Sequence, residues 1–471
     1  MTLEDQVLRY RTRRQLFRDC GTGLGKVALA SLISGATARA AGTHFAPKVD
    51  RVIYLFMAGG PSQLELFDYK PELVKYDAQP VPESQFKGKR FAFMDTFAKE
   101  PPKLLGTRRT FKQHGKSGHW VSDLFPNIAT VSDDITLIHG ITTENFNHGP
   151  AKLFTNTGST RPGRPSMGSW VTYGIGSEAE NLPGFVVLQS GPRGPRGGAS
   201  LWSSGFLPTS FQGVPFRSVG DPILDLSNPR GVDAATQRQT LDAIADLNRI
   251  ELKTSGDPEI ATRISQYEMA YQMQTSGPEL IDLAKESKET LEMYGAEPGK
   301  GSYANNCLLA RRLVERGVRF VQLYHTDWDH HEDLTKPLEG VTRDVDKPTA
   351  ALIRDLKQRG LLERTLVIWG GEFGRTPMGE VREKGKIGRN HHIDASTIFM
   401  AGGGIKQGAV VGGTDELGFS ATDEKIEVFD VQATILHLLG LDHQKLTFKS
   451  QGRDFRLTDV RGRLIQPLLA G

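Results

Sequence analysis

Six short runs of β-branched and aromatic residues recur along this chain, and glycine or polar residues follow them. The runs are Arg51–Ala58, Asp134–His139, Gly184–Leu188, Arg319–Tyr324, Thr365–Trp369 and Thr397–Ala401. Helical patterns lie between and around them at Ser122–Val131, Pro150–Thr157, Ser166–Tyr173, Ala234–Lys253, Ala304–Glu315, Lys347–Gln358 and Val428–Leu439. Alternating strands and helices are typical of an α/β fold, so we predict a doubly wound, mostly parallel sheet with helices on both faces.

No change of composition marks a boundary between two independent halves, so we predict a single domain over residues 50–471. A hydrophobic content of 38% is enough for a core of that size. The polar, helical stretch around residues 233–300 is expected to be an insertion. The stretch Gln189–Ser227 is rich in Gly, Pro and Ser, and is expected to form a long structured excursion near the site.

The first forty residues have the order of an export signal. The pair Arg13-Arg14 precedes a mildly apolar stretch from Gly21 to Ala36, and the small-x-small sequence Ala38-Arg39-Ala40 follows. We therefore predict that residues 1–40 are a twin-arginine signal peptide, which places the protein in the periplasm or otherwise outside the cytoplasm. A basic amphipathic helix is the alternative. The stretch is too short and too polar for a stable membrane span.

Charge and cysteine usage exclude some classes of function. The formal net charge is +3, but the basic excess lies in the first forty residues and the remainder is close to neutral. Because nucleic-acid affinity comes largely from phosphate neutralisation, we predict no nucleic-acid partner. The chain has only two cysteines, Cys20 and Cys307. Since Cys20 would leave with the signal, we predict no disulfide and expect Cys307 to be a core residue.

Histidines and carboxylates gather in the loops beside the apolar runs. Seven of the twelve histidines lie in three loops: His139, His148, His325, His330, His331, His391 and His392. Ligands bind outside the carboxyl ends of parallel strands, so we expect these loops to converge. Asp329 and His331 are two residues apart and face one side of an extended segment, while His330 faces the other. Imidazole with carboxylate suits Zn²⁺ or Mn²⁺ better than Ca²⁺, so we predict a divalent metal site.

Several segments carry a resemblance to a known family. They include LFMAGGPSQLELFDYKPEL, HGKSGHWVSDLFPNIA, NFNHGPAKLFTNTGS, DWDHHEDL, LVIWGGEFGRTP, GRNHHIDASTIFMAGGG and GRDFRLTDV. In family order and over nearly all of residues 50–471, they resemble an uncharacterised, exported sulfatase-like family (a domain of unknown function) of the alkaline phosphatase superfamily. The resemblance implies an alkaline phosphatase-like sheet that presents two metals to a phosphate or sulfate ester. A Ser, Thr or modified Cys at a helix N-terminus then attacks in line.

The resemblance also implies roles for individual residues. The positions that match metal ligands are Asp329, His331, Glu372 and His391, and His148 occupies the nucleophile's position. The first run lacks an immediate Asp, and Glu65 or Asp68 comes only after a Gly-Gly-Pro-Ser turn, so Glu65 is the candidate ligand there. Phe373 stands where most members carry a His. We therefore expect one metal site to be intact and the other to be altered.

The role of His148 has several interpretations at this stage. One interpretation is that His148 replaces the missing imidazole as a metal ligand. A second is that it forms a phosphohistidine, and a third is that it caps a helix whose first turn contains Pro150. Alternatively a water on the metal attacks, because a bound divalent ion lowers the pKa of water towards neutrality.

Arg375 is expected to bind a tetrahedral oxyanion through its planar fork, and the alternative is a surface arginine paired with Glu372.

The function expected from these features is metal-dependent hydrolysis of sulfate or phosphate esters outside the cytoplasm. The expected substrates are anionic esters, and esters of polysaccharides are among them. A phosphomutase or phosphodiesterase on the same scaffold is the enzymatic alternative. A degenerate relative that binds a metal or an anionic glycan without turnover is the other. The lack of a hydroxyl nucleophile at position 148 and the phenylalanine at position 373 favour the degenerate relative, and the retained Asp/His/Glu set favours the hydrolase. The oligomeric state is left open.

Overall fold

The computed structural model of the chain describes residues 42–87, 91–92, 102–179, 181–217, 219, 232–382, 385–423 and 425–470. The predicted signal peptide at residues 1–40 lies outside these residues. Among the residues in these ranges, no helix is long and apolar enough to cross a membrane.

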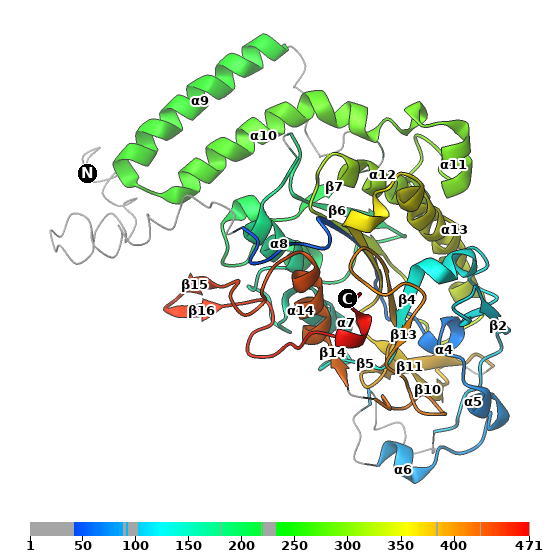
Figure 1. Cartoon of the computed structure of the whole chain (residues 1–471). Helices are drawn as coiled ribbons and strands as arrows, with labels where there is room; N and C mark the ends of the chain where they lie inside the picture. The colour runs from blue at the N-terminus through cyan, green and yellow to red at the C-terminus, as the bar shows by residue number, and fades with distance from the viewer. Residues whose placement is uncertain are drawn as a thin grey trace.

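An eight-stranded sheet forms the centre of the fold (Figure 1). Its strands, in spatial order, are β13 (Val410–Val411), β4 (Ile135–Ile138), β12 (Ile398–Gly402), β9 (Thr365–Gly370), β1 (Arg51–Met57), β8 (Phe320–His325), β6 (Phe185–Ser190) and β7 (Val214–Phe216). Each of the six predicted strands is present, with bounds that agree within two residues. β1 lies at the centre and pairs in parallel with both β8 and β9. The predicted α/β class with a mostly parallel sheet is confirmed.

β12 is the exception, because it runs antiparallel to both of its neighbours, β4 and β9. The amino end of β12 therefore lies at the same edge as the carboxyl ends of the parallel strands. The hairpin of β10 (Gly374–Glu380) and β11 (Gly388–His392) comes just before β12 in the chain, so it lies at that edge. In a wholly parallel sheet the residues just before this strand would lie at the opposite edge.

Helices cover both faces of the sheet, as β1 shows residue by residue. Its Ile53, Leu55 and Met57 pack in one core with α12 (Tyr303–Glu315) and α13 (Lys336–Gln358). Its Val52, Tyr54 and Phe56 pack in a second core with α8 (Met167–Ile175) and α14 (Val428–Leu438). Alternate residues of a strand point to opposite faces of the sheet. Both alternating sets of β1 residues are apolar, so the strand is buried on both faces. Cys307 on α12 is a fully buried free thiol, as predicted.

Two predicted helices differ from the structure. Residues Ser122–Val131 were expected to be helical, but strand β3 (His119–Ser122) ends there and the 3₁₀ segment η2 (Ile128–Asp134) begins six residues later. The helix predicted at Lys347–Gln358 starts at Lys336 and continues through Pro348, so that proline is inside the helix rather than at its start. In both cases packing against the sheet outweighs the local start and stop signals.

The predicted insertion is largely a pair of long helices. α9 (Ala234–Ser255) and α10 (Pro258–Ile281) run antiparallel, and Figure 1 shows that α9 lies on the outer side of α10. The described residues of α9 include no buried side chain. The short α11 (Lys288–Tyr294) then leads back to the sheet domain.

The remaining elements are short. Those before residue 220 are α4 (Gln63–Leu66), α5 (Pro71–Lys75), α6 (Glu83–Phe86), β2 (Phe111–His114), β5 (Ile141–Thr142), α7 (His148–Thr157), η3 (Gly198–Trp202) and η4 (Thr209–Phe211). Those after it are η5 (Leu283–Lys285), η6 (Leu362–Arg364), β14 (Ile426–Glu427), β15 (Phe448–Ser450), β16 (Arg453–Phe455) and η7 (Gln466–Leu468).

Candidate metal centre

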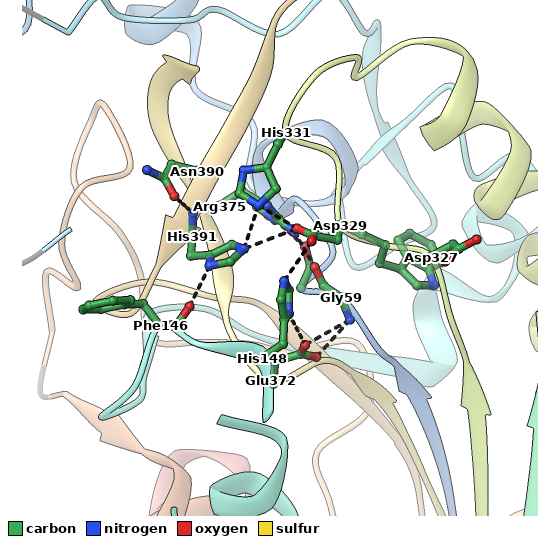
Figure 2. Close-up of polar contacts among 12 residues, drawn as sticks. Gly59, Phe146, His148, Asp327, Asp329, His331, Glu372, Arg375, Asn390 and His391 are labelled. Carbon is green, nitrogen blue, oxygen red and sulfur yellow. Dashed lines mark hydrogen bonds and ion pairs between the residues drawn. The ribbon is translucent and has the colours of Figure 1, made fainter. Parts of the chain in front are cut away.

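Four side chains from three separate segments meet at the carboxyl edge of the sheet. His148 is the first residue of α7, Asp329 and His331 lie in the loop after β8, and His391 lies on β11. One ligand atom from each lies within 4.8 Å of the others (Figure 2). Asp329 is central: its Oδ2 lies 3.0 Å from His148 Nε2, and its Oδ1 lies 2.8 Å from His331 Nε2 and 3.2 Å from His391 Nε2.

Each of the three imidazoles is held through its other ring nitrogen. The Nδ1 of His148 lies 2.8 Å from Glu372 Oε1, that of His331 lies 2.5 Å from Glu380 Oε2, and that of His391 lies 2.6 Å from the carbonyl oxygen of Phe146. Carboxylates and carbonyls only accept, so each Nδ1 carries the donated proton. Each Nε2 then presents a lone pair to the common centre, which is how proteins orient histidines that bind metals.

Facing lone pairs of this kind are satisfied by a cation or by an added proton. His331 Nε2 and His391 Nε2 lie 2.9 Å apart, although neither has a proton to share in the neutral state. The buried Nε2 of His148 lies 3.0 Å from Asp329 Oδ2, where it donates a hydrogen bond only when the ring carries a second proton. Three imidazole nitrogens with one carboxylate oxygen form a donor set that suits Zn²⁺ or Mn²⁺. We conclude that the residues present fit a single divalent metal ion.

The electrostatics of the protein groups at the site agree with this assignment. Burial raises the pKa of Asp329, but hydrogen bonds from His148, His331 and His391 more than offset it and hold the pKa far below its ordinary range. Burial lowers the pKa of His391 to about 4, so this ring is neutral at physiological pH. Burial also lowers the pKa of His148, but its bonds to Asp329 and Glu372 outweigh that effect and leave the pKa raised. The raised pKa of His148 shows that its surroundings favour a positive charge at this position.

Glu372, predicted as a metal ligand, is not one of the four. Its Oε1 accepts from His148 Nδ1, and the backbone N–H of Gly59 lies 3.0 Å from Oε1 and 3.1 Å from Oε2. The carboxylate is fully buried, and it is enclosed by donors. Glu372 therefore orients His148 through its ring nitrogen Nδ1 and is not part of the four-residue cluster.

Gly59 and Phe373 supply no ligand to the centre, although both lie next to it. A Cβ atom on Gly59, whose φ is +127°, would lie 2.7 Å from the backbone nitrogens of Trp328 and Asp329. The ring of Phe373 packs on His148 and His391, with ring centroids 5.0 and 4.6 Å apart. An acidic side chain cannot be accommodated at position 59 without moving this backbone, so neither position 59 nor Phe373 provides a ligand for a second ion.

Gly59→Ala is expected to destabilise the protein by about 1–3 kcal/mol, since the new methyl group meets backbone atoms that cannot move aside. Chemical denaturation measures the change. Gly301→Ala is the matched control, because a Cβ there meets nothing within 4 Å, and it should change stability by less than about 0.5 kcal/mol. Equal stability of the two variants would contradict the tight approach at Gly59.

Glu65, the candidate ligand after the first strand, lies in a different interaction. The guanidinium of Arg389 binds it with Nε 3.0 Å from both carboxylate oxygens and Nη2 2.6 Å from Oε1. Ser62 also donates to the same carboxylate. Both members of the pair are buried, at 3% and 0% exposure. Glu65 is not part of the four-residue cluster and instead ties α4 to β11.

Glu65→Gln is expected to lower stability by about 3–5 kcal/mol, because it leaves a buried guanidinium without its counter-charge, while metal content stays unchanged. Denaturation and elemental analysis of the same sample measure the two effects. Glu72→Gln is the control: it breaks a surface pair with Lys75 and should cost less than about 1 kcal/mol. Loss of metal from Glu65→Gln would restore Glu65 as a ligand candidate.

Arg375 is directed at the protein rather than at open space. Its Nε donates to Gly60 O at 2.8 Å, its Nη1 donates to Arg389 O at 3.1 Å, and its Nη2 donates to Asp329 Oδ1 at 2.6 Å. The Nη2 group also donates to the carbonyl oxygen of Gly59. The side chain is 1% exposed, so the alternative of a surface arginine paired with Glu372 does not hold, and the predicted binding of an oxyanion stays a prediction. Arg375 holds Asp329 in place.

A cavity of about 790 Å³ opens beside the centre. The metal-site residues His148, Asp329 and His331 lie in its wall, together with Lys152. Part of the predicted Gly/Pro-rich excursion, residues 192–196, also lines it. His330 lies in the wall too, but it is outside the cluster, and burial lowers its pKa to about 4. The volume is typical of small-molecule sites.

Three contributors to the site had not been singled out from the sequence. Glu380 and the carbonyl of Phe146 orient His331 and His391, and no local pattern marks either of them. Lys152 is different: it lies four residues after His148, a spacing that places two side chains on one face of a helix. That spacing is the signal by which Lys152 could have been found.

Within the described part of the chain, the fold and the site together define an α/β protein with a candidate metal centre at the carboxyl edge of its sheet. A family profile described as Protein of unknown function (DUF1501) matches residues 49–469, so the chain belongs to this family. No match was found among curated proteins.

Solved structures show distant likenesses. One is Ps i-CgsB in complex with k-i-k-neocarrahexaose, at 11% identity over 83% of this chain and 72% of that one, with a TM-score of 0.37. The PsFucS1 sulfatase from Pseudoalteromonas sp. matches at 13% identity over 88% and 71%, with a TM-score of 0.33. Alkaline phosphatase from the Antarctic bacterium TAB5 matches at 10% identity over 84% and 99%, also with a TM-score of 0.33.

Proposed function

We propose that this protein is a metal-dependent hydrolase of sulfate or phosphate esters. The observation that carries the proposal is the cluster of His148, Asp329, His331 and His391 in the wall of a cavity large enough for a substrate. A divalent ion bound there would act as a Lewis acid and would lower the pKa of a water towards neutrality. The protein's part is to orient the ligands, hold the substrate and limit the access of bulk water.

The charge balance of the site favours an anionic substrate. Each carboxylate near the centre has a cationic neighbour: Asp329 has Arg375 at 2.6 Å, Glu380 has Arg382 at 2.8 Å, and Glu372 has Lys152 at 3.8 Å. The histidines must be neutral to bind a metal. The protein groups therefore nearly cancel, and a divalent ion would keep about two uncompensated positive charges. An ester anion would offset them.

We assign His148 to the role of ligand rather than cap or nucleophile. α7 begins at His148, two residues before the predicted start, and its N-cap is Asn147. The ring of His148 contacts Glu372 and Asp329 instead of the free N–H groups of the helix. Arg375 is assigned to holding Asp329.

A metal-binding protein without turnover is the second candidate. Four protein ligands fill a tetrahedral shell, and closed shells are typical of structural zinc sites, whereas catalytic sites keep a position open. This candidate would bind the metal alone or with an anionic glycan. A phosphomutase or phosphodiesterase is the remaining enzymatic option on this scaffold.

We further propose that the protein works outside the cytoplasm, after export through the twin-arginine pathway. The pair Arg13-Arg14 and the sequence Ala38-Arg39-Ala40 support this proposal. Fractionation of cells that express the wild type and the Arg13→Lys/Arg14→Lys variant tests it. Normal export of the double variant would contradict the assignment.

The activity is tested by elemental analysis of the purified protein, followed by a panel of matched esters with zinc or manganese. The panel contains a sulfate monoester, a phosphate monoester and a phosphate diester with the same leaving group, together with sulfated oligosaccharides. We expect about one divalent ion per chain and turnover of one ester class. One bound ion without turnover of any ester would favour the second candidate.

Metal affinity is expected to fall as the pH is lowered, because protons compete for the ligand nitrogens. The pKa of His148 is raised, so as the pH is lowered protons begin to compete with the metal for this ring above about pH 6.5, the ordinary histidine value. Below the pKa of His148 the ring is mostly protonated and this loss of affinity is fully established. His391, with a pKa of about 4, does not compete until far lower pH. Titration of the metal-free protein with zinc at a series of pH values measures this. Constant affinity from pH 8 to 5 would contradict His148 as a ligand.

A further inference from the structure

Lys152 is a buried cation beside the metal centre that the proposed site has not yet used. It lies on α7 one helical turn after His148, so both side chains project from the same face of the helix. Lys152 is 3% exposed and lines the cavity together with His148 and Gly59. A lysine is rarely buried so completely unless a partner offsets the loss of hydration.

The protein offers this lysine only a weak partner. Its Nζ lies 3.8 Å from Glu372 Oε1, which is beyond hydrogen-bond distance. That oxygen already accepts from His148 Nδ1 and from the N–H of Gly59. Among the residues that the structure describes, none accepts a hydrogen bond from Nζ. The three donors of this ammonium group therefore remain for something that enters the cavity.

The other cations next to the centre are already engaged. Arg375 is 1% exposed and donates to several carbonyl groups and to Asp329, and it is not part of the cavity wall. Arg382 donates to Glu380 Oε1 at 2.8 Å. Lys152 is thus the cation that is both close to the metal ligands and open to the cavity.

We propose that Lys152 binds an oxygen of the substrate's anionic group, next to the metal. This inference rests on the proposed function, and it moves the anion-binding role that the sequence suggested for Arg375 to a different residue. An ammonium group acts as a point charge, which suits a tetrahedral sulfate or phosphate group. Because the site is buried, the interaction is stronger and less screened by salt than a surface contact.

The rim of the cavity narrows the class of substrate. Its cations are Arg193, Arg196, Arg343, Arg382 and Lys386, and its acids are Asp327, Glu332, Asp333 and Asp344. Arg382 is paired with Glu380, which lies outside the lining. The other four cations match the four acids in number, and Arg193 pairs directly with Asp327 at 2.9 Å. Net attraction for an anion is therefore concentrated at Lys152 and the metal. The substrate that fits carries one ester anion deep in the cavity on an otherwise polar, uncharged body such as a sugar.

The test compares zinc-loaded wild type with Lys152→Met and Lys152→Arg. Calorimetric titration with methyl sulfate and with methyl phosphate measures anion binding without requiring turnover. Lys152→Met should weaken binding of the preferred anion by about 10- to 100-fold, since a hydrogen bond to a charged group is lost. Lys152→Arg should retain binding within about tenfold. The zinc content should be equal in all three proteins, and the anion with the larger effect identifies the ester class.

Lys70→Met is the matched control. Lys70 is also largely buried and pairs with Asp68 at 3.0 Å, but it lies outside the cavity, so its loss should leave anion binding unchanged. Should Lys152→Met fail to fold, Lys152→Gln provides the same loss of charge with a polar side chain.

Two outcomes would overturn the proposal: unchanged binding of both anions by Lys152→Met, or loss of zinc from it, which would make Lys152 a support of the centre. The proposed function is judged separately by the ester panel. If the wild type hydrolyses no ester while Lys152→Met still weakens anion binding, the hydrolase proposal fails and the role of Lys152 stands. If the wild type and Lys152→Met hydrolyse esters equally well, the hydrolase proposal stands and the proposed role of Lys152 fails.

Discussion

His331→Ala is expected to remove the bound metal and, with it, any turnover. The imidazole of His331 supplies one of four ligand atoms, and its Nε2 lies 2.8 Å from Asp329 Oδ1 and 2.9 Å from His391 Nε2. Even changes to residues that only orient a ligand typically cost 10- to 100-fold in metal affinity, so loss of a ligand should exceed about 100-fold. Competition with a zinc-binding dye measures the affinity of the wild type and the variant.

His330→Ala is the matched control for this experiment. His330 is the adjacent residue, is also buried, and lines the same cavity, but it lies outside the cluster. Its variant should keep the full metal content. If His331→Ala retains wild-type affinity, or if both variants lose the metal alike, the centre is assigned to the wrong residues.

His148→Asn is the prediction with the next largest effect. As a ligand held by Glu372, His148 should be irreplaceable by an amide, and the variant should lose metal affinity by more than about 100-fold together with any activity. The fold should survive, because Asn is tolerated in the first turn of a helix and the N-cap, Asn147, is unchanged. Circular dichroism and zinc titration of the same preparation measure the two effects.

Other outcomes separate the roles that the sequence left open for His148. Full metal content with an acid-labile phosphoryl adduct on the wild type would show that His148 is a nucleophile. Full metal content with full activity would show that the residue is no more than a part of the first turn of α7. Neither result is expected, because both ring nitrogens of His148 already face carboxylates.

Some of the site could be predicted from the sequence because the relevant distances along the chain are short. Asp329 and His331 face the same side of one extended segment because they are two residues apart, and His330 is left out for the same reason. The convergence of loops after β1, β8 and β9 follows from parallel strands whose carboxyl ends share an edge. Alternating apolar runs and helical patterns were enough to predict this sheet.

Other features depend on which segments pack together. Glu65 follows the first strand in a position that resembles a ligand's, but its charge is taken up by Arg389, 324 residues further along the chain. Arg375 has the composition of an anion-binding turn, yet burial against Gly59, Gly60 and Asp329 turns its donors inward. No sequence pattern reports such partners, since a side chain's hydrogen bonds are decided by neighbours in space.

The sequence by itself therefore determined the class of fold, the edge of the sheet at which the site lies, and the residue types that gather there. Local spacing and strand polarity control these features, and both can be read from the chain. Only the tertiary structure decided that β12 runs antiparallel and brings His391 to that edge. The packing of distant segments likewise decided that position 59 has no space for a side chain and that Phe373 packs against His148. It also decided that Lys152, rather than Arg375, is the cation facing the cavity.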